Sequence, residues 1–255
     1  MTSAFRDWLF KPPYKGVPWI VWCYVALSCL VVTTGGVYKG ELTGFDDPVR
    51  MTQVLNWVNG AGWYDRTITR VNAPDGFTSI WSRLVDIPIA LVILIAQQFV
   101  AQKKAALIAS VVIPFTELAL LFPVMRYFAR PLVGKKDAWL VVLFLLFTTV
   151  TNFNPFSVAG FHTGEASHHS WYVILDLLMF GAVARIALGV IGSSPALMMG
   201  GAAGGLLAVG IEGLPMIAGS VLLLGGLGWY CNRPALPQRG MQALIYATLL
   251  GLILL

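Results

Sequence analysis

Charged side chains are scarce in this 255-residue chain: Asp, Glu, Lys and Arg together make up 11% of it. A soluble domain carries roughly 25%. Hydrophobic residues account for 57%, and the mean hydropathy is +0.75. This shortage of charge excludes a soluble globular protein and predicts an all-α polytopic membrane protein. The net charge of +5 is explained by basic loops on the cytoplasmic side, so it gives no indication of nucleic acid binding.

Cysteine is nearly absent as well, with three residues in the whole chain. All three lie in or beside apolar segments and lack the spacing of metal ligands, which argues against a metal centre or a disulfide framework built on cysteine. Residues 1–16 mix Lys, Arg and Asp ahead of a full-length apolar segment. That pattern differs from a cleavable signal peptide, and we expect these residues to form a cytoplasmic arm.

Apolar segments dominate the rest of the chain, and residues 17–255 are predicted to form a single transmembrane domain. Several of these segments are long enough to cross a hydrocarbon core of about 30 Å. About seven spans are expected, at residues 17–37, 105–128, 138–151, 172–190, 196–211, 214–230 and 241–255. Small residues spaced four apart between Gly200 and Gly205 predict a face on which one helix packs closely against another.

Basic residues set the expected orientation of these spans. The strongest positive cluster, between Arg126 and Lys136, should lie in the cytoplasm. With the N-terminus also in the cytoplasm, residues 38–104 and 152–171 then form two external loops. The apolar segment 86–100 is short for a span and is interrupted by a proline, so we expect it to be an interfacial helix within the first of these loops.

Paired carboxylates stand near the beginning of the first external loop, where Asp46 and Asp47 precede Pro48 and Arg50. Charged groups are costly to hold near lipid, so this first polar segment indicates a functional site. An alternative is that Asp47 caps a helix that starts at Pro48 and runs to about Asn59. Capping explains one of the two aspartates but not both.

All three histidines lie in a second polar segment, residues 161–171. His168 and His169 are adjacent, so they should not point the same way on a helix, and no cysteine or acidic triad completes a zinc signature. An acid–base or phosphate-binding role and simple hydrogen bonding at the membrane surface remain as alternatives. Because this loop is predicted on the same side of the membrane as Asp46 and Asp47, the two polar segments can converge.

The arrangement of these motifs resembles the membrane glycosyltransferases of the GT-C fold, including the catalytic subunit of oligosaccharyltransferase. The acidic segment 45–50 is similar to their first external motif, and residues 129–134 are similar to their basic inner turn. The segment from Trp81 to Asp86 fits the Trp-Ser-Arg-Leu-Val-Asp motif of a bacterial branch in full. That branch has Gly-Arg-Ile-Asp-His-His where residues 164–169 stand. Here the glycine and both histidines are kept, with Glu and Ser in place of the Arg and Asp.

The resemblance implies sugar transfer from a polyprenyl-phosphate-linked donor at the outer face of a bacterial inner membrane. It implies a carboxylate base and cationic groups, or a divalent cation such as Mg²⁺ or Mn²⁺, to stabilise the leaving phosphate. Asp46 and Asp47 are the candidate catalytic residues. The candidate substrate-binding residues are Arg50, Trp81, Arg83, Asp86, Glu165, His168 and His169.

Simpler roles and other functions compete with this interpretation. In the simpler alternatives, Arg50 pairs with Asp46 along the start of the helix, and Arg83 pairs with Asp86 three residues on. The altered second motif also fits a catalytically degenerate structural or accessory subunit of a larger membrane complex, in contact with lipid and with other membrane subunits. A transporter ranks last, because the predicted spans contain few polar residues.

Overall fold

The structure is a computed structural model that describes residues 23, 27, 37, 39–42, 44, 46–150, 161, 163–166, 168–190 and 192–254; the side chains of 135–150 and 251–254 are not described. The predicted cytoplasmic arm (1–16) lies outside these residues, as does nearly all of the first predicted span (17–37). The described residues include most of the first loop predicted to be external and part of the second, with residues of both polar segments among them.

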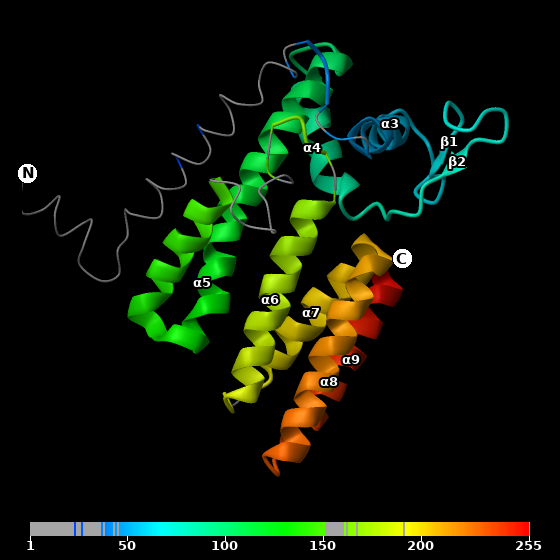
Figure 1. Cartoon of the computed structure of the whole chain (residues 1–255). Helices are drawn as coiled ribbons and strands as arrows, with labels where there is room; N and C mark the ends of the chain where they lie inside the picture. Colours follow the sequence, from blue (N-terminus) through cyan, green and yellow to red (C-terminus); the bar gives the residue numbers. More distant parts are fainter. Residues whose placement is uncertain are drawn as a thin grey trace, which may run out of the picture. The chain divides into compact units, whose positions relative to one another are not determined.

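The described part of the chain is mostly helical, as the composition predicts. The elements follow one another along the chain as shown in Figure 1. They are α3 (Asp46–Val58), β1 (Thr67–Ile68), β2 (Phe77–Thr78), α4 (Asp86–Ala96), α5 (Gln102–Val150), α6 (His169–Ala187), α7 (Ser194–Val209), the 3₁₀ turn η2 (Ile211–Gly213), α8 (Leu214–Tyr230) and α9 (Ala235–Leu254).

Three helical segments of the described chain are long and apolar enough to cross a membrane, judged by length and composition. They are Gln102–Gly134 in α5, His169–Ala187, and Ile211–Tyr230, which joins η2 to α8. The helices Asp86–Ala96 and Ser194–Val209 are apolar but shorter. These features are compatible with a membrane protein. The expected total of seven spans is not confirmed, and the side of the membrane on which each loop lies stays a prediction.

Helix α5 contains one break, at Gly134, whose backbone angles are φ 84° and ψ 173°. A positive φ of this size favours glycine, because a Cβ atom would strain the backbone there. The family resemblance implies an inner turn over residues 129–134, whereas the helix continues to the end of that segment before it breaks. Figure 1 shows the chain reversing direction at this break.

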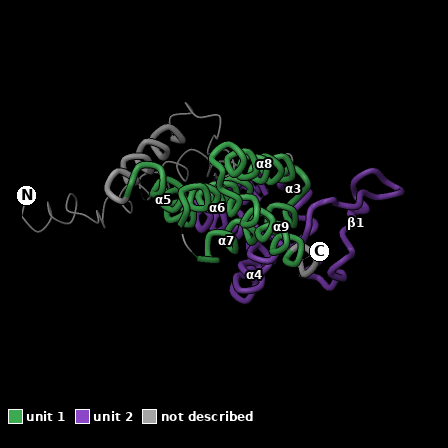
Figure 2. Tube along the Cα trace, turned by 90° about the horizontal axis from the view of Figure 1, so that it is seen from below, with its two compact units in different colours: residues 1–25, 119–157, 172–255 green, residues 26–118, 158–171 purple. Residues whose placement is uncertain are grey.

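Two compact units make up the chain and are coloured separately in Figure 2. Unit 1 comprises residues 1–25, 119–157 and 172–255, and unit 2 comprises 26–118 and 158–171. The core of unit 1 is formed by apolar side chains of α6 to α9, among them Met179, Ile186, Met199, Leu206, Ile217 and Leu224. Unit 2 contains α3, the two strands, α4 and the first part of α5, together with the second polar segment.

Helix α3 forms where sequence analysis expects a helix, but it begins two residues earlier, at Asp46. Its buried apolar side chains include Met51 and Val54, which lie three residues apart and therefore on one face. Gly60 follows the helix with φ 104°, and its amide donates to the carbonyl of Trp57. The helix thus ends near Asn59, as expected, with a glycine in the left-handed conformation that commonly follows a helix.

A short hairpin, which sequence analysis did not anticipate, connects α3 to α4. Its strands β1 and β2 are antiparallel, with Thr67 opposite Thr78 and Ile68 opposite Phe77. The connection between them includes a turn at residues 72–76, where the Gly76 amide donates to the Asn72 carbonyl. Strands of two residues are too short to leave an alternating pattern in the sequence.

The glycine-rich segment of α7 packs against α9, as its spacing predicts. A Cβ atom on Gly200 would lie 2.6 Å from the Ala243 carbonyl oxygen and 2.6 Å from Cβ of Tyr246. One turn further along, a Cβ atom on Gly204 would lie 3.0 Å from the Ala247 carbonyl oxygen. The backbones of the two helices approach this closely only because the side chains are absent.

We therefore expect Gly200→Ala to lower the free energy of unfolding by about 1–3 kcal/mol, since the added methyl group forces α7 and α9 apart. Gly201→Ala is the matched control, because a Cβ atom there would meet nothing within 4 Å. That change should leave the stability unaltered or raise it by about 0.5–1 kcal/mol. Unfolding of the purified protein in mixed detergent, as the denaturing detergent is increased, measures both. Equal effects of the two substitutions would contradict close packing at Gly200.

Candidate functional site

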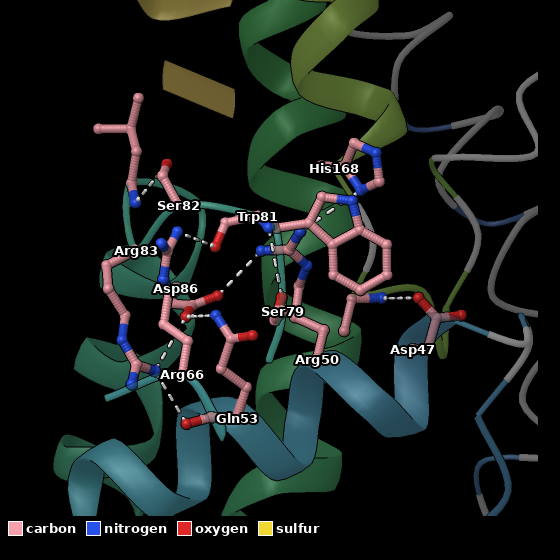
Figure 3. Close-up of polar contacts among 12 residues, drawn as sticks. Asp47, Arg50, Gln53, Arg66, Ser79, Trp81, Ser82, Arg83, Asp86 and His168 are labelled. Carbon is pink, nitrogen blue, oxygen red and sulfur yellow. Dashed lines mark hydrogen bonds and ion pairs between the residues drawn. The ribbon is translucent and has the colours of Figure 1, made fainter. Parts of the chain in front are cut away.

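A buried charge cluster in unit 2 is centred on Asp86, the first residue of α4. The Asp86 carboxylate has no exposed surface. It accepts hydrogen bonds from Arg50 Nη1 at 2.9 Å, Gln53 Nε2 at 2.7 Å and Arg83 Nη1 at 3.2 Å. Arg50 and Gln53 are three residues apart on α3 and so reach the carboxylate from one face of that helix. Figure 3 shows the three donors converging on the Asp86 side chain.

The segment that carries Arg83 and Asp86 is held by local hydrogen bonds. The Ser79 hydroxyl accepts from the amide of Trp81 at 3.3 Å, and the Ser82 hydroxyl accepts from the amide of Leu84 at 3.3 Å. Serine side chains commonly fix turns in this way. Arg66 Nη1 donates to the Trp81 carbonyl at 3.2 Å and ties the same segment to the beginning of the hairpin.

Arg83 is engaged almost entirely with the protein itself. Besides its ion pair with Asp86, it donates to the backbone carbonyls of Gln53 at 3.0 Å and Trp63 at 3.2 Å, and to that of Asp65. Four of the five N–H donors of a guanidinium group are thereby used. The pairing of Arg83 with Asp86 is confirmed, and these contacts leave one N–H donor of the guanidinium group for a phosphate ligand.

Arg50 connects this cluster to the second polar segment. Its Nη2 lies 3.4 Å from His168 Nδ1, and its guanidinium carbon lies 5.0 Å from the centre of the Trp81 ring, within cation–π range. Burial lowers the pKa of Arg50, and the neighbouring Asp86 carboxylate opposes that shift. Arg50 thus forms its ion pair with Asp86 and not with Asp46, so the pairing along the helix start is wrong.

Asp47 joins the two polar segments through the backbone. Its Oδ1 accepts from the Ala166 amide at 2.7 Å, and its Oδ2 accepts from the Gly44 amide at 2.6 Å. The side chain is completely buried. Burial raises the pKa of Asp47, and the charge on Asp46 adds to this effect, whereas the two backbone hydrogen bonds and His169 oppose it.

The predicted capping role of Asp47 is therefore wrong in its geometry. Helix α3 begins one residue before Asp47, and the carboxylate reaches back to Gly44 instead of to an amide of the helix. Gly44 lies so close that a Cβ atom on it would be 2.6 Å from Asp47 Oδ2. With both oxygens occupied by amides and no exposed surface, Asp47 acts as a structural link between the polar segments.

Other predicted site residues are accessible to solvent, in contrast to the buried residues described above. Asp46 and Glu165 are partly buried, and His169 is exposed. The rings of His168 and His169 lie 4.6 Å apart between centroids, and His168 also lies 5.1 Å from the Trp81 ring. The expectation that the two histidines do not point the same way on a helix is not tested, because α6 begins at His169 and leaves His168 outside the helix.

Glu117 is a buried carboxylate that the sequence motifs did not identify. It lies within the segment of α5 that is long and apolar enough to cross a membrane and is only 3% exposed. The Ser170 hydroxyl donates to its Oε2 at 2.7 Å, which ties α5 to the second polar segment. A lone carboxylate inside an apolar span is the signal that indicates it. Asp176 in α6 is a second such residue, within unit 1.

The described residues do not form the divalent cation site that the resemblance allows. No group of three or more His, Cys, Asp or Glu side chains in this part of the chain is placed to hold a metal ion. The donor set explains why: both oxygens of Asp47 bind backbone amides, and both oxygens of Asp86 bind arginine or glutamine. Mg²⁺ and Mn²⁺ need such oxygens as ligands.

No family model, curated protein or solved structure matches this chain. Function is therefore inferred from the residues and contacts described above. These place a partly exposed carboxylate, Asp46, and an exposed imidazole, His169, near the buried and hydrogen-bonded arginines Arg50 and Arg83.

Proposed function

We propose that the chain is the core of a GT-C-like glycosyltransferase, which transfers a sugar from a polyprenyl-phosphate-linked donor at the outer face of a bacterial inner membrane. One observation carries the proposal. The first acidic segment and the histidine segment, 119 residues apart, are joined by the hydrogen bond from the Ala166 amide to Asp47. The interaction of Arg50 with His168 joins them a second time. The same two segments carry the motifs that resemble those of the superfamily.

The contacts divide the expected roles among these residues. Asp46 is the proposed base that takes the proton of the acceptor, because it retains exposed surface whereas Asp47 does not. His169, exposed at the start of α6, is the proposed donor to the leaving phosphate. Arg50 contributes positive charge from behind His168. Asp47, Arg83 and Asp86 hold this arrangement in place.

A structural or accessory subunit is the second candidate, and a specific observation favours it. The four most deeply buried charged residues of the site, Asp47, Arg50, Arg83 and Asp86, all bind groups of the protein. A cluster of this kind also serves to fix the fold of unit 2 without any chemistry. The two candidates differ in whether a lipid-linked sugar binds.

Thermal unfolding of the purified chain in lipid nanodiscs distinguishes them. A polyprenyl-phosphate-linked sugar should raise the unfolding temperature, equivalent to about 2.7 kcal/mol when the ligand is at a hundred times its dissociation constant. Polyprenol without phosphate should give a much smaller rise. His169→Ala should weaken the response, while Asp75→Ala on the exposed turn between the strands should leave it unchanged. A chain that responds to no lipid-linked sugar is a structural subunit.

A further inference from the structure

A small pocket in unit 2 lies apart from the Asp86 cluster. Its volume is about 240 Å³, and it opens to the surface. It is bounded by the loop before α3, by α3 itself and by the beginning of α5. The lining residues are Gly40, Leu42, Met51, Leu55, Gln102, Lys103, Ala106 and Leu107. Five of these are apolar side chains, so the interior suits hydrocarbon better than a sugar or a nucleotide.

A hydrogen bond joins Gln102, a lining residue at the beginning of α5, to the residue that follows α3. Gln102 Nε2 donates to Asn59 Oδ1 at 2.9 Å. Ala106, which is buried, lines the wall next to that contact. Typical pockets for a whole small molecule are about 300–1,000 Å³. This one is smaller, so it accommodates one segment of an apolar chain.

One lysine lines the pocket, and two more stand next to lining residues in the sequence. Lys103 lines the pocket and is exposed, Lys104 is exposed beside it, and Lys39 and Glu41 flank Gly40 in the loop. These four residues, three lysines and one glutamate, carry a net charge of +2. The pocket also lies at the beginning of Gln102–Gly134, a segment apolar enough to cross a membrane. The end of such a helix is where lipid headgroups lie, and basic residues there attract anionic lipids.

We propose that this pocket binds an anionic phospholipid, with a segment of one acyl chain inside the apolar lining and the phosphate on Lys103. The charge at the rim complements a phosphodiester, and the interior complements a hydrocarbon chain. The α4 helix nearby in the sequence exposes Leu91, Leu94 and Ile95, and Phe99 follows it with 85% exposure. Such apolar surface is what a protein presents to lipid.

Lipid-dependent stability of the full chain tests this site. The purified protein in detergent is titrated with phosphatidylglycerol and, separately, with phosphatidylcholine of the same acyl chains, while thermal unfolding or native mass spectrometry reports binding. We expect phosphatidylglycerol to bind more tightly. Lys103→Ala should weaken that binding about fivefold. Lys104→Ala is the matched control, since Lys104 has the same charge and exposure but does not line the pocket, and its effect should be smaller. Leu107→Trp, which fills the pocket, should remove the response.

Several outcomes would overturn the proposal. They are equal binding of the two phospholipids, equal losses for Lys103→Ala and Lys104→Ala, and protection by inorganic phosphate alone, which would indicate an anion site without a lipid chain. Binding of polyprenyl phosphate to the exclusion of phosphatidylglycerol would also overturn it. The first three outcomes have no bearing on sugar transfer at Asp46, whereas the last would overturn the phospholipid site and support the proposed sugar transfer, so failures of the two proposals can be told apart.

Discussion

Replacing Asp86 with alanine should reduce the free energy of unfolding by about 3–5 kcal/mol, which is typical when one partner of a buried ion pair is removed. Asp86 accepts from two arginines, Arg50 and Arg83, and neither is exposed. The substitution leaves both guanidinium groups buried without their carboxylate and leaves the Gln53 amide without its acceptor. A whole domain is stable by only about 5–15 kcal/mol, so the loss is a large part of the total.

Asp75→Ala is the control for this experiment. It removes a carboxylate from the exposed turn between the strands and should change the stability by no more than about 0.5 kcal/mol. Equilibrium unfolding in mixed detergent, followed by tryptophan fluorescence, measures both variants. A loss below about 1 kcal/mol for Asp86→Ala would mean that the two arginines find other partners and that Asp86 is not the centre of unit 2.

Asp46→Asn should lower the rate of sugar transfer by about 10²–10⁴-fold, the range that a positioned general base contributes. The amide keeps the size of the side chain but cannot take a proton. Because Asp46 is only partly buried, the variant should fold normally. Release of polyprenyl phosphate from a lipid-linked sugar donor measures the rate, and the thermal unfolding of the same sample reports the fold.

Asp47→Asn serves as the comparison, because it should lower the stability that Asp46→Asn leaves unchanged. One of its oxygens becomes an NH₂ group that faces a backbone amide, either at Gly44 or at Ala166, so stability should fall. If Asp46→Asn keeps the full rate, Asp46 is not the base. If the unaltered protein, tested with a range of lipid-linked sugars, releases no polyprenyl phosphate, the structural-subunit interpretation takes over.

The features of the fold that sequence could predict are local ones. The helix after the paired aspartates, the short apolar helix at Asp86–Ala96 and the glycine face of α7 each depend on residues a few positions apart. Spacing of three or four residues is visible in the sequence, and so is the glycine stop at Gly60. The break in α5 falls at the end of the expected turn, because Gly134 alone in that segment tolerates the positive φ.

The contacts of the site were harder to predict because their partners are distant in sequence or lie on the backbone. Arg50 pairs with a residue 36 positions away, although an acidic residue stands four positions before it. Asp47 binds the backbone amide of Ala166. Any residue other than proline has such an amide, so the sequence does not reveal this contact. Glu117 is a single carboxylate in a segment that is apolar enough to be a membrane span. The sequence shows the carboxylate, but it does not show its partner Ser170, 53 positions away.

The link between Asp47 and Ala166 also has a consequence for how the chain is made. The ribosome adds about 5–20 residues per second, so the 119 positions that separate these two residues take roughly 6–24 s to synthesise. Throughout that interval the first polar segment has been translated but lacks its later counterpart. Water or the insertion machinery must solvate the carboxylate meanwhile. Unit 2 can therefore finish folding only after the histidine segment has left the exit tunnel.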